Sequence, residues 1–387
     1  MLRSVMRATG QAHFRSTMYL ANTVSGRRSR RFRKSNVPVA ELTPLAASQA
    51  VLDELVKVYF SVGREPLASV DIGQLHADLD AIIDHNAVTG SPHVEPEAPG
   101  DYSIERRRFG GVRGEWLRFE SGWAPHDDAP GRDPWIDDDI NNIAQVGLLR
   151  HPDHEARPWL VLVHGAEMGR HRLDARIMRA EYFHDELGVN VAMPVLPRHG
   201  PRGPGTGHVR GEFPSDDFVS NIHGLTQAVW DVRQLLAWIR DQGGDTIGIY
   251  GFSLGGNVTA QIAQHEPDVD ALIAGCPAVS MVDLVRSNMP PAIRRRHREL
   301  FDKAAVASEV ISPLSSAAVT PHENLVVLGA AHDRLADPLN QAARLWKHWD
   351  EPEFHVLPRG HVSFMFGQTA TRTIEAALRQ RGVSHHR

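Results

Sequence analysis

The residues of this 387-residue chain best suited to chemistry lie in the segment 251–255, which reads Gly-Phe-Ser-Leu-Gly. It follows a short apolar run, 246–250, typical of a buried strand, and precedes a segment with helical character, 257–265. A sharp turn from a strand into a helix requires glycine on both sides of its central residue, because Cβ atoms there would collide with neighbouring backbone. Such a turn leaves the hydroxyl of Ser253 standing above the end of a sheet.

A serine hydroxyl is a useful nucleophile only when a base accepts its proton and a third group orients that base. Both partners follow Ser253 in the chain, each just beyond a predicted strand. Asp333 comes after the segment 324–329, and His361 comes after the segment 354–358. The order serine, acid, histidine is the order that this turn geometry requires.

Both partners have rivals nearby. Asp337 competes with Asp333, which is favoured because it lies closer to the end of its strand. His332 and His355 compete with His361, which is favoured by its place after a strand end and directly after a glycine. The spacing therefore favours Asp333 and His361.

A third element lies upstream, where the predicted strand 159–163 ends in His164-Gly165. A His-Gly pair at this place directs a backbone N–H toward the serine, and the N–H of Leu254 lies on the other side. Two such donors form an oxyanion hole, and each is worth about 3 kcal/mol in acyl transfer. The side chain of His164 is expected to be structural.

These elements together resemble the α/β-hydrolase superfamily over roughly residues 143–380. The resemblance implies that Ser253 is the nucleophile, that His361 is the general base and then the general acid, and that Asp333 is the orienting carboxylate. It also implies that Leu254 and Ala166 supply the oxyanion N–H groups, with Glu167 as the alternative to Ala166. The stretch 194–202 resembles more narrowly the "domain-containing 18" type of α/β hydrolase.

The predicted function is that of a serine hydrolase, similar to carboxylesterases and lipases. It would cleave a carboxylic ester or related acyl bond of a small molecule through an acyl-enzyme intermediate. No cofactor, metal or nucleic acid is expected, and His199, His208 and His223 are interpreted as loop or helix-cap residues. The alternatives are a non-catalytic member of the fold, an acyltransferase, and a membrane-associated lipid hydrolase.

The elements that must position these residues alternate between strand and helix from about residue 143, which predicts an α/β fold with a mostly parallel central sheet flanked by helices. The predicted strands are 159–163, 189–193, 246–250, 271–275, 325–328 and 353–357. The clearest predicted helix covers 223–242, where apolar residues recur at helical spacing. The segment 102–123 is predicted to be a β-hairpin turning at Gly110-Gly111.

Three parts of the chain are expected: a basic, flexible segment 1–40, a helical extension 41–100, and a hydrolase domain 101–387 with a helical cap at about 280–320. Residues 1–40 contain nine Arg or Lys and no acid. This charge permits peripheral membrane contact. Arg294–Arg298 in the cap is expected to be a solvated helix face, and the alternative is a site lid that favours an acidic substrate or a membrane phosphate. The single cysteine excludes an internal disulfide and is compatible with a cytoplasmic location. The sequence fixes no oligomeric state.

Overall fold

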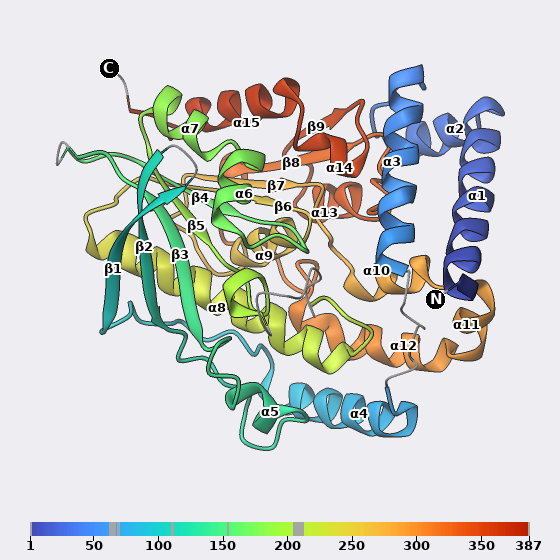
Figure 1. Cartoon of the computed structure of the whole chain (residues 1–387), viewed down its shortest axis with the longest axis horizontal. Helices are drawn as coiled ribbons and strands as arrows, with labels where there is room; N and C mark the ends of the chain where they lie inside the picture. The colour runs from blue at the N-terminus through green and yellow to red at the C-terminus, as the bar shows by residue number, and fades with distance from the viewer. Residues whose placement is uncertain are drawn as a thin grey trace.

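The computed structural model describes residues 2–61, 67, 70–109, 112–152, 155–203 and 213–385. The strands are β1 (Tyr102–Phe109), β2 (Val112–Glu120), β3 (Ile143–Leu149), β4 (Trp159–Val163), β5 (Asn190–Pro194), β6 (Ile247–Phe252), β7 (Ala271–Gly275), β8 (Leu325–Ala330) and β9 (Glu353–Leu357). In the described chain they form one sheet in the order β1-β2-β3-β5-β4-β6-β7-β8-β9 (Figure 1). The first three strands pair antiparallel, β3 meets β5 antiparallel, and all later pairs are parallel. The predicted α/β fold with a mostly parallel central sheet is confirmed.

Helices cover both faces of this sheet because the side chains of its central strands point alternately to each face. In β4, Leu160 and Leu162 belong to one apolar core, whereas Val161 and Val163 belong to the other. The helices packed on the first core are α6 (His171–Ile177), α7 (Ala180–Leu187) and α15 (Gln368–Gln380). Those on the second include α8 (Phe218–Asp241), α9 (Leu254–Ile262) and α13 (Ala342–His348).

The segment predicted to form a cap lies between β7 and β8 and consists of short helices: α10 (Met281–Asn288), α11 (Pro291–Arg296), α12 (Arg298–Ala307) and η2 (Ser308–Ile311). The arginines at 294–296 and 298 are exposed. This exposure agrees with the solvated helix face expected from the sequence.

The remaining short helices are α5 (Arg132–Ile136), α14 (His361–Phe364), η1 (Gly200–Arg202) and η3 (His322–Asn324).

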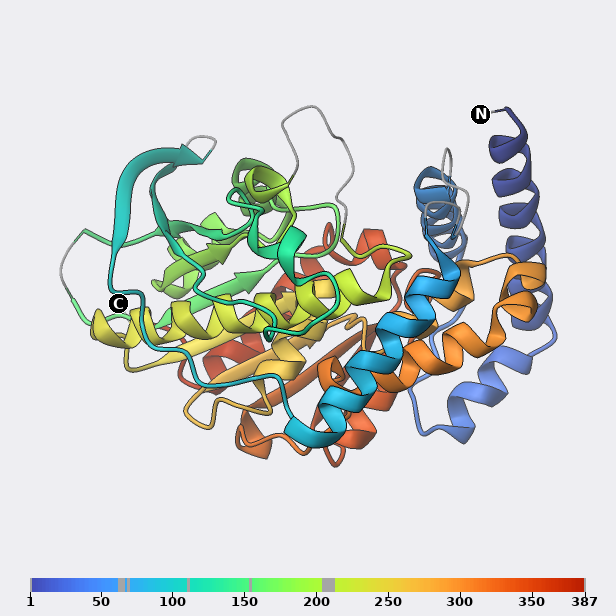
Figure 2. The same ribbon diagram turned by 90° about the horizontal axis from the view of Figure 1, so that it is seen from below.

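The N-terminal residues form α1 (Leu2–Val24), α2 (Arg27–Lys34), α3 (Pro44–Ser61) and α4 (Ile72–Thr89). The predicted flexible segment 1–40 is thus largely helical in its described part. The reason is tertiary, because Tyr19 and Phe32 are buried, and Phe32 packs against Val37 and Ala343. In both views α1 to α3 lie at one end of the molecule (Figures 1 and 2).

The predicted strands match observed ones within two residues at each end, and the hairpin is confirmed as β1 and β2. Its turn at Gly110-Gly111 lies outside the described residues, as does His208. β3 has no counterpart among the predicted strands, and its seven residues are almost fully buried. No described helix combines the length and the apolar character that crossing a membrane requires.

Candidate active site

Ser253 lies in the turn between β6 and α9, with φ 57° and ψ −109°. A positive φ is uncommon for a residue with a side chain and is characteristic of this kind of strained turn. A Cβ on Gly251 would overlap the carbonyl of Gly255, and one on Gly255 would overlap the carbonyl of Val163. The two glycines are therefore required by close backbone approach, and they leave the Ser253 side chain half-exposed.

A chain of hydrogen bonds links Ser253 to two residues from later in the sequence. The Oγ of Ser253 lies 2.9 Å from Nε2 of His361, and Nδ1 of His361 lies 2.5 Å from Oδ2 of Asp333. The other oxygen of Asp333 accepts the backbone N–H groups of Leu335 and Ala336, at 2.8 and 2.7 Å. Those two bonds fix the carboxylate so that it faces the imidazole.

The environment of His361 raises its pKa. Burial alone lowers the pKa, but the Asp333 carboxylate and its hydrogen bond stabilise the imidazolium, and the net shift is upward. The Asp53 carboxylate adds to this effect and the Lys57 ammonium opposes it. A base with a raised pKa holds an accepted proton more firmly, but it is available as a base only above that pKa.

The rival residues are engaged elsewhere. Asp337 accepts the N–H groups of residues 339 and 340 within its own turn. His355 pairs with Glu353 at 2.6 Å on the outer strand β9. His332 lies between the Tyr19 hydroxyl and the Glu41 carbonyl. Of the candidate acids and histidines, the structure brings Asp333 and His361 to Ser253.

The segment proposed for the oxyanion hole lies against the turn 251–255, which carries Ser253. A Cβ on Gly165 would stand 3.4 Å from the Cβ of Ser253. The Nδ1 of His164 hydrogen-bonds the carbonyl of Gly165 at 2.7 Å, and its Nε2 accepts the N–H of Leu196 at 3.0 Å. Because Nε2 is an acceptor, Nδ1 carries the proton. His164 is therefore structural, as its sequence position suggested, and it fixes the orientation of the peptide between Gly165 and Ala166.

The narrower motif 194–202 contains a buried arginine with a structural role. The guanidinium of Arg202 donates to Asp231 at 2.7 Å and to the carbonyls of Val195 and Asn141. Asp231 lies on α8 and also accepts the hydroxyl of Ser121. This network attaches the loop after β5 to the long helix α8.

Sequence analysis did not identify Asp53 of α3, although it is fully buried beside the site. Its carboxylate accepts the backbone N–H groups of Arg334, His361 and Val362, at 2.8 to 3.0 Å. The next residue, Glu54, pairs with Arg15 of α1 and with Arg334. The local sequence around Asp53 shows only two adjacent acids on a helix whose opposite face is apolar. This pattern does not indicate which groups Asp53 binds.

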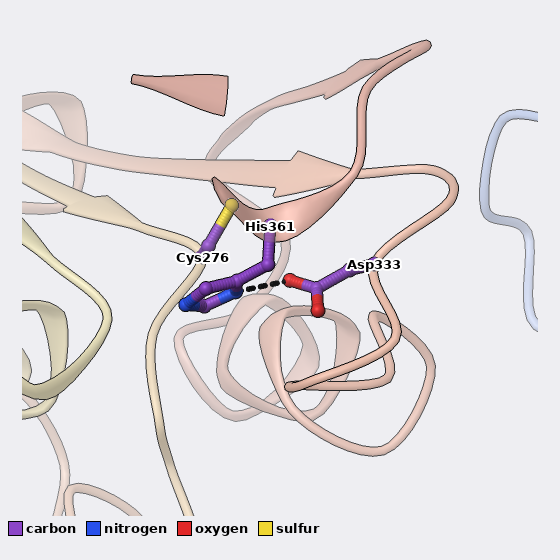
Figure 3. A group of neighbouring side chains, drawn as sticks. All are labelled: Cys276, Asp333 and His361. Atoms are coloured by element: carbon purple, nitrogen blue, oxygen red, sulfur yellow. Dashed lines mark hydrogen bonds and ion pairs between the residues drawn. The ribbon is translucent and has the colours of Figure 1, made fainter. Parts of the chain in front are cut away.

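Cys276 lies close to the pair of Asp333 and His361, and these three residues offer ligand atoms within 4.8 Å of one another (Figure 3). Sulfur, nitrogen and oxygen donors of this kind suit zinc. However, Nδ1 of His361 already bonds Asp333, and burial followed by the nearby carboxylates raises the pKa of the Cys276 thiol. Metal binding requires the thiolate. The group therefore fits a hydrogen-bonded His–Asp pair beside a neutral thiol better than it fits a metal centre.

A cavity of about 490 Å³ lies away from this site, between α4, α12 and the residues that follow α9. Gln264 and His265 line it at the carboxyl end of α9, whereas Ser253 precedes the amino end. A nine-residue helix is about 13 Å long. This cavity is therefore separate from the candidate site, because none of Ser253, Asp333 and His361 lines it.

No model of a known protein family matches the chain. The uncharacterized protein Rv2627c of Mycobacterium tuberculosis (strain ATCC 25618 / H37Rv) is 36% identical over 357 residues, which cover 90% of this chain and 85% of that protein. The chain belongs to its family. The uncharacterized protein MT2702 of M. tuberculosis (strain CDC 1551 / Oshkosh) is also 36% identical to this chain over 357 residues, with the same coverage of both proteins.

Solved structures with a distant likeness include acetyl xylan esterase 1 from Thermoanaerobacterium sp. JW/SL YS485, at 14% identity and a TM-score of 0.49, covering 80% of this chain and 98% of that one. The acetyl xylan esterase from Paenibacillus sp. R4 has 12% identity and a TM-score of 0.49, with coverage of 83% and 97%. The hyperthermophilic esterase of the archaeon Pyrobaculum calidifontis has 16% identity and a TM-score of 0.47, with coverage of 88% and 100%. Likeness at this level does not identify an activity.

Proposed function

We propose that this protein is a serine hydrolase that cleaves a carboxylic ester or a related acyl bond of a small molecule. The observation that carries the proposal is the continuous chain from Ser253 Oγ through the His361 imidazole to the Asp333 carboxylate, with contacts of 2.9 and 2.5 Å. In this mechanism His361 takes the hydroxyl proton while Ser253 attacks the carbonyl carbon. His361 then returns the proton to the leaving alcohol, and an acyl-enzyme remains.

In the second half of the reaction, a water molecule gives a proton to His361 and attacks the acyl carbon, which releases the acid and restores Ser253. The N–H groups of Leu254 and Ala166 are proposed to stabilise the oxyanion. Two observations support them. Leu254 is the first residue of α9, where a backbone N–H has no acceptor within the helix. The Gly165 carbonyl points toward the His164 ring, to which it is hydrogen-bonded. The N–H of Ala166 belongs to the same planar trans peptide and therefore points away from the His164 ring.

The test is reaction with a fluorophosphonate probe and turnover of p-nitrophenyl acetate, butyrate and octanoate. We expect the wild type to be labelled and active, and Ser253→Ala and His361→Ala each to lose about 10⁴- to 10⁶-fold in kcat. Ser287→Ala, which removes an exposed serine on α10, is the matched control and should keep full activity. An unlabelled and inactive wild type, or an active Ser253→Ala variant, would refute the proposal. The narrower resemblance to the domain-containing 18 type stays a prediction.

A second candidate, a membrane-associated lipid hydrolase, is favoured by one surface of α3. Leu45, Leu52, Leu55 and Tyr59 share a helical face and are 40–59% exposed. Neighbouring helix α2 exposes five arginine or lysine side chains, at 27, 30, 31, 33 and 34. Apolar side chains together with basic charge are what binding to an anionic membrane surface requires.

This candidate predicts that the protein sediments with vesicles containing phosphatidylserine, that added salt weakens the binding, and that Leu55→Glu weakens it further. Phe366→Glu is the control, because Phe366 is also exposed, at 66%, but follows α14 instead of lying on α3. Equal sedimentation of wild type and Leu55→Glu would count against this candidate. It would leave the serine hydrolase proposal untouched.

A further inference from the structure

The two loops that carry Asp333 and His361 are joined by one buried side chain from the N-terminal extension. Oδ2 of Asp53 accepts the N–H of His361 at 2.8 Å and the N–H of Arg334 at 3.0 Å, and Oδ1 accepts the N–H of Val362 at 3.0 Å. Arg334 follows Asp333 directly, and Val362 follows His361. A single carboxylate therefore fixes the backbone on both sides of the pair formed by Asp333 and His361.

The approach of α3 to these loops is close and leaves no free space. A Cβ on Gly360 would lie 3.0 Å from Oδ2 of Asp53 and 3.0 Å from the Gln49 carbonyl. The side chain of Gln49 also accepts the N–H of Gly360, at 3.3 Å. The glycine before His361 thus lets α3 reach the loop, and Asp53 is completely buried at the contact.

We propose that Asp53 is a positioning residue of the active site, which holds the loops of Asp333 and His361 in register and places a second negative charge beside the imidazole. This inference rests on the proposed serine hydrolase function. It assigns part of the site to α3, which lies outside the segment 143–380 that resembles other α/β hydrolases. Accurate placement matters because displacing a catalytic group by about 1 Å can cost about 10²-fold in rate.

The charge of Asp53 has a separate, measurable consequence, because it helps to raise the pKa of His361. Burial and then Asp333 raise the pKa of Asp53 itself, while its backbone N–H donors oppose that shift. The titratable and charged groups around Asp53 come from α1, α3, the residue after β7 and the two loops: Arg15, Tyr19, Glu54, Lys57, Cys276, Asp333, Arg334 and His361. With Asp53 neutralised and the other groups unchanged, the pKa of His361 falls.

The experiment compares wild type, Asp53→Asn and Glu54→Gln in fluorophosphonate labelling and in p-nitrophenyl acetate turnover as a function of pH. Asp53→Asn should lower kcat by about 10²-fold, leave KM within about threefold, and move the acidic limb of the pH profile to lower pH. The limb moves down because His361 loses its proton at a lower pH when the second negative charge is gone. Glu54→Gln removes the adjacent buried acid, which accepts no backbone N–H of the two loops. This variant should therefore keep the acidic limb of the wild-type pH profile.

Gly360→Ala tests the same contact if Asp53→Asn does not fold. The added methyl group pushes the loop away from Asp53 but keeps the charge, so kcat should fall at least about tenfold while the acidic limb moves much less. If the wild type is labelled, two results would overturn this inference and leave the proposed function standing. One is a folded Asp53→Asn variant with the wild-type kcat and the wild-type acidic limb of the pH profile, and the other is a Gly360→Ala variant with the wild-type kcat. An unlabelled wild type would instead overturn the proposed function, and this inference with it.

Discussion

The two halves of the candidate site are held in place by different kinds of contact. Ser253 is positioned locally, by a tight turn in which Gly251 and Gly255 touch the backbone of neighbouring elements. The loops that carry His361 and Asp333 are held by hydrogen bonds from the N–H groups of His361 and Arg334 to Asp53, which lies 308 residues before His361 in the sequence. We refer below to the turn 251–255 as the serine turn and to Asp53 with its loops 333–334 and 360–362 as the clamp.

This difference indicates how each half will respond to change. The serine turn is enclosed by buried strands and α9, so it unfolds only when the core of the sheet unfolds. The clamp depends on how α3 and α1 dock against the loops after β8 and β9 (Figure 1). We therefore expect substitutions in the clamp to change activity more than stability, and substitutions of the two glycines of the serine turn to change stability first.

Of the substitutions that compare the clamp with the serine turn, Asp333→Asn in the clamp is expected to have the largest effect on activity. An amide at this place cannot hold the required tautomer of His361, so kcat should fall by about 10⁴-fold while the fold is kept. The matched control is Asp337→Asn, which changes a carboxylate that accepts only local N–H groups and should stay within about threefold of wild type. The measurements are ester turnover and the thermal unfolding midpoint. Comparable losses for both variants would remove the distinction between Asp333 and Asp337.

An intermediate effect is expected for Gly255→Ala, in the serine turn. The methyl group would overlap the carbonyl oxygens of Val163 and His164, which belong to a buried strand end and cannot move away. Overpacking of this kind costs about 1–3 kcal/mol of unfolding free energy. Gly100→Ala is the control, because a Cβ there would meet nothing within 4 Å, and it should change stability by less than about 0.5 kcal/mol. Urea unfolding distinguishes the two, and a stable Gly255→Ala would mean that the turn tolerates more than its contacts suggest.

The serine turn could be predicted from the sequence because its constraints act over a few residues. Glycine spacing, a preceding apolar strand and a following helix are all local, and so are the strand ends that bear Asp333 and His361. The contact of Asp53 with these loops could not be predicted in this way. Asp53 looks like one of many helix acids, and its partners are backbone N–H groups, which every residue except proline possesses. The helices of the basic segment 1–40 could not be predicted for the same reason, since they are stabilised by tertiary contacts of Tyr19 and Phe32.

The smallest effect is expected for Tyr19→Phe, which tests whether α1 supports the clamp from outside. The hydroxyl of Tyr19 bonds Nδ1 of His332 at 2.7 Å, next to Asp333, and both side chains are buried. Removing the hydroxyl leaves a ring nitrogen without its partner, which should cost about 1 kcal/mol of unfolding free energy. Because the bonds from Asp53 to the loops remain, kcat should stay within about threefold. Tyr182→Phe, which removes a partly exposed bond to Glu375 on α15, is the control and should cost only a few tenths of a kcal/mol. A large fall in kcat for Tyr19→Phe without loss of stability would mean that the clamp begins at α1 and that Asp53 is only one part of it.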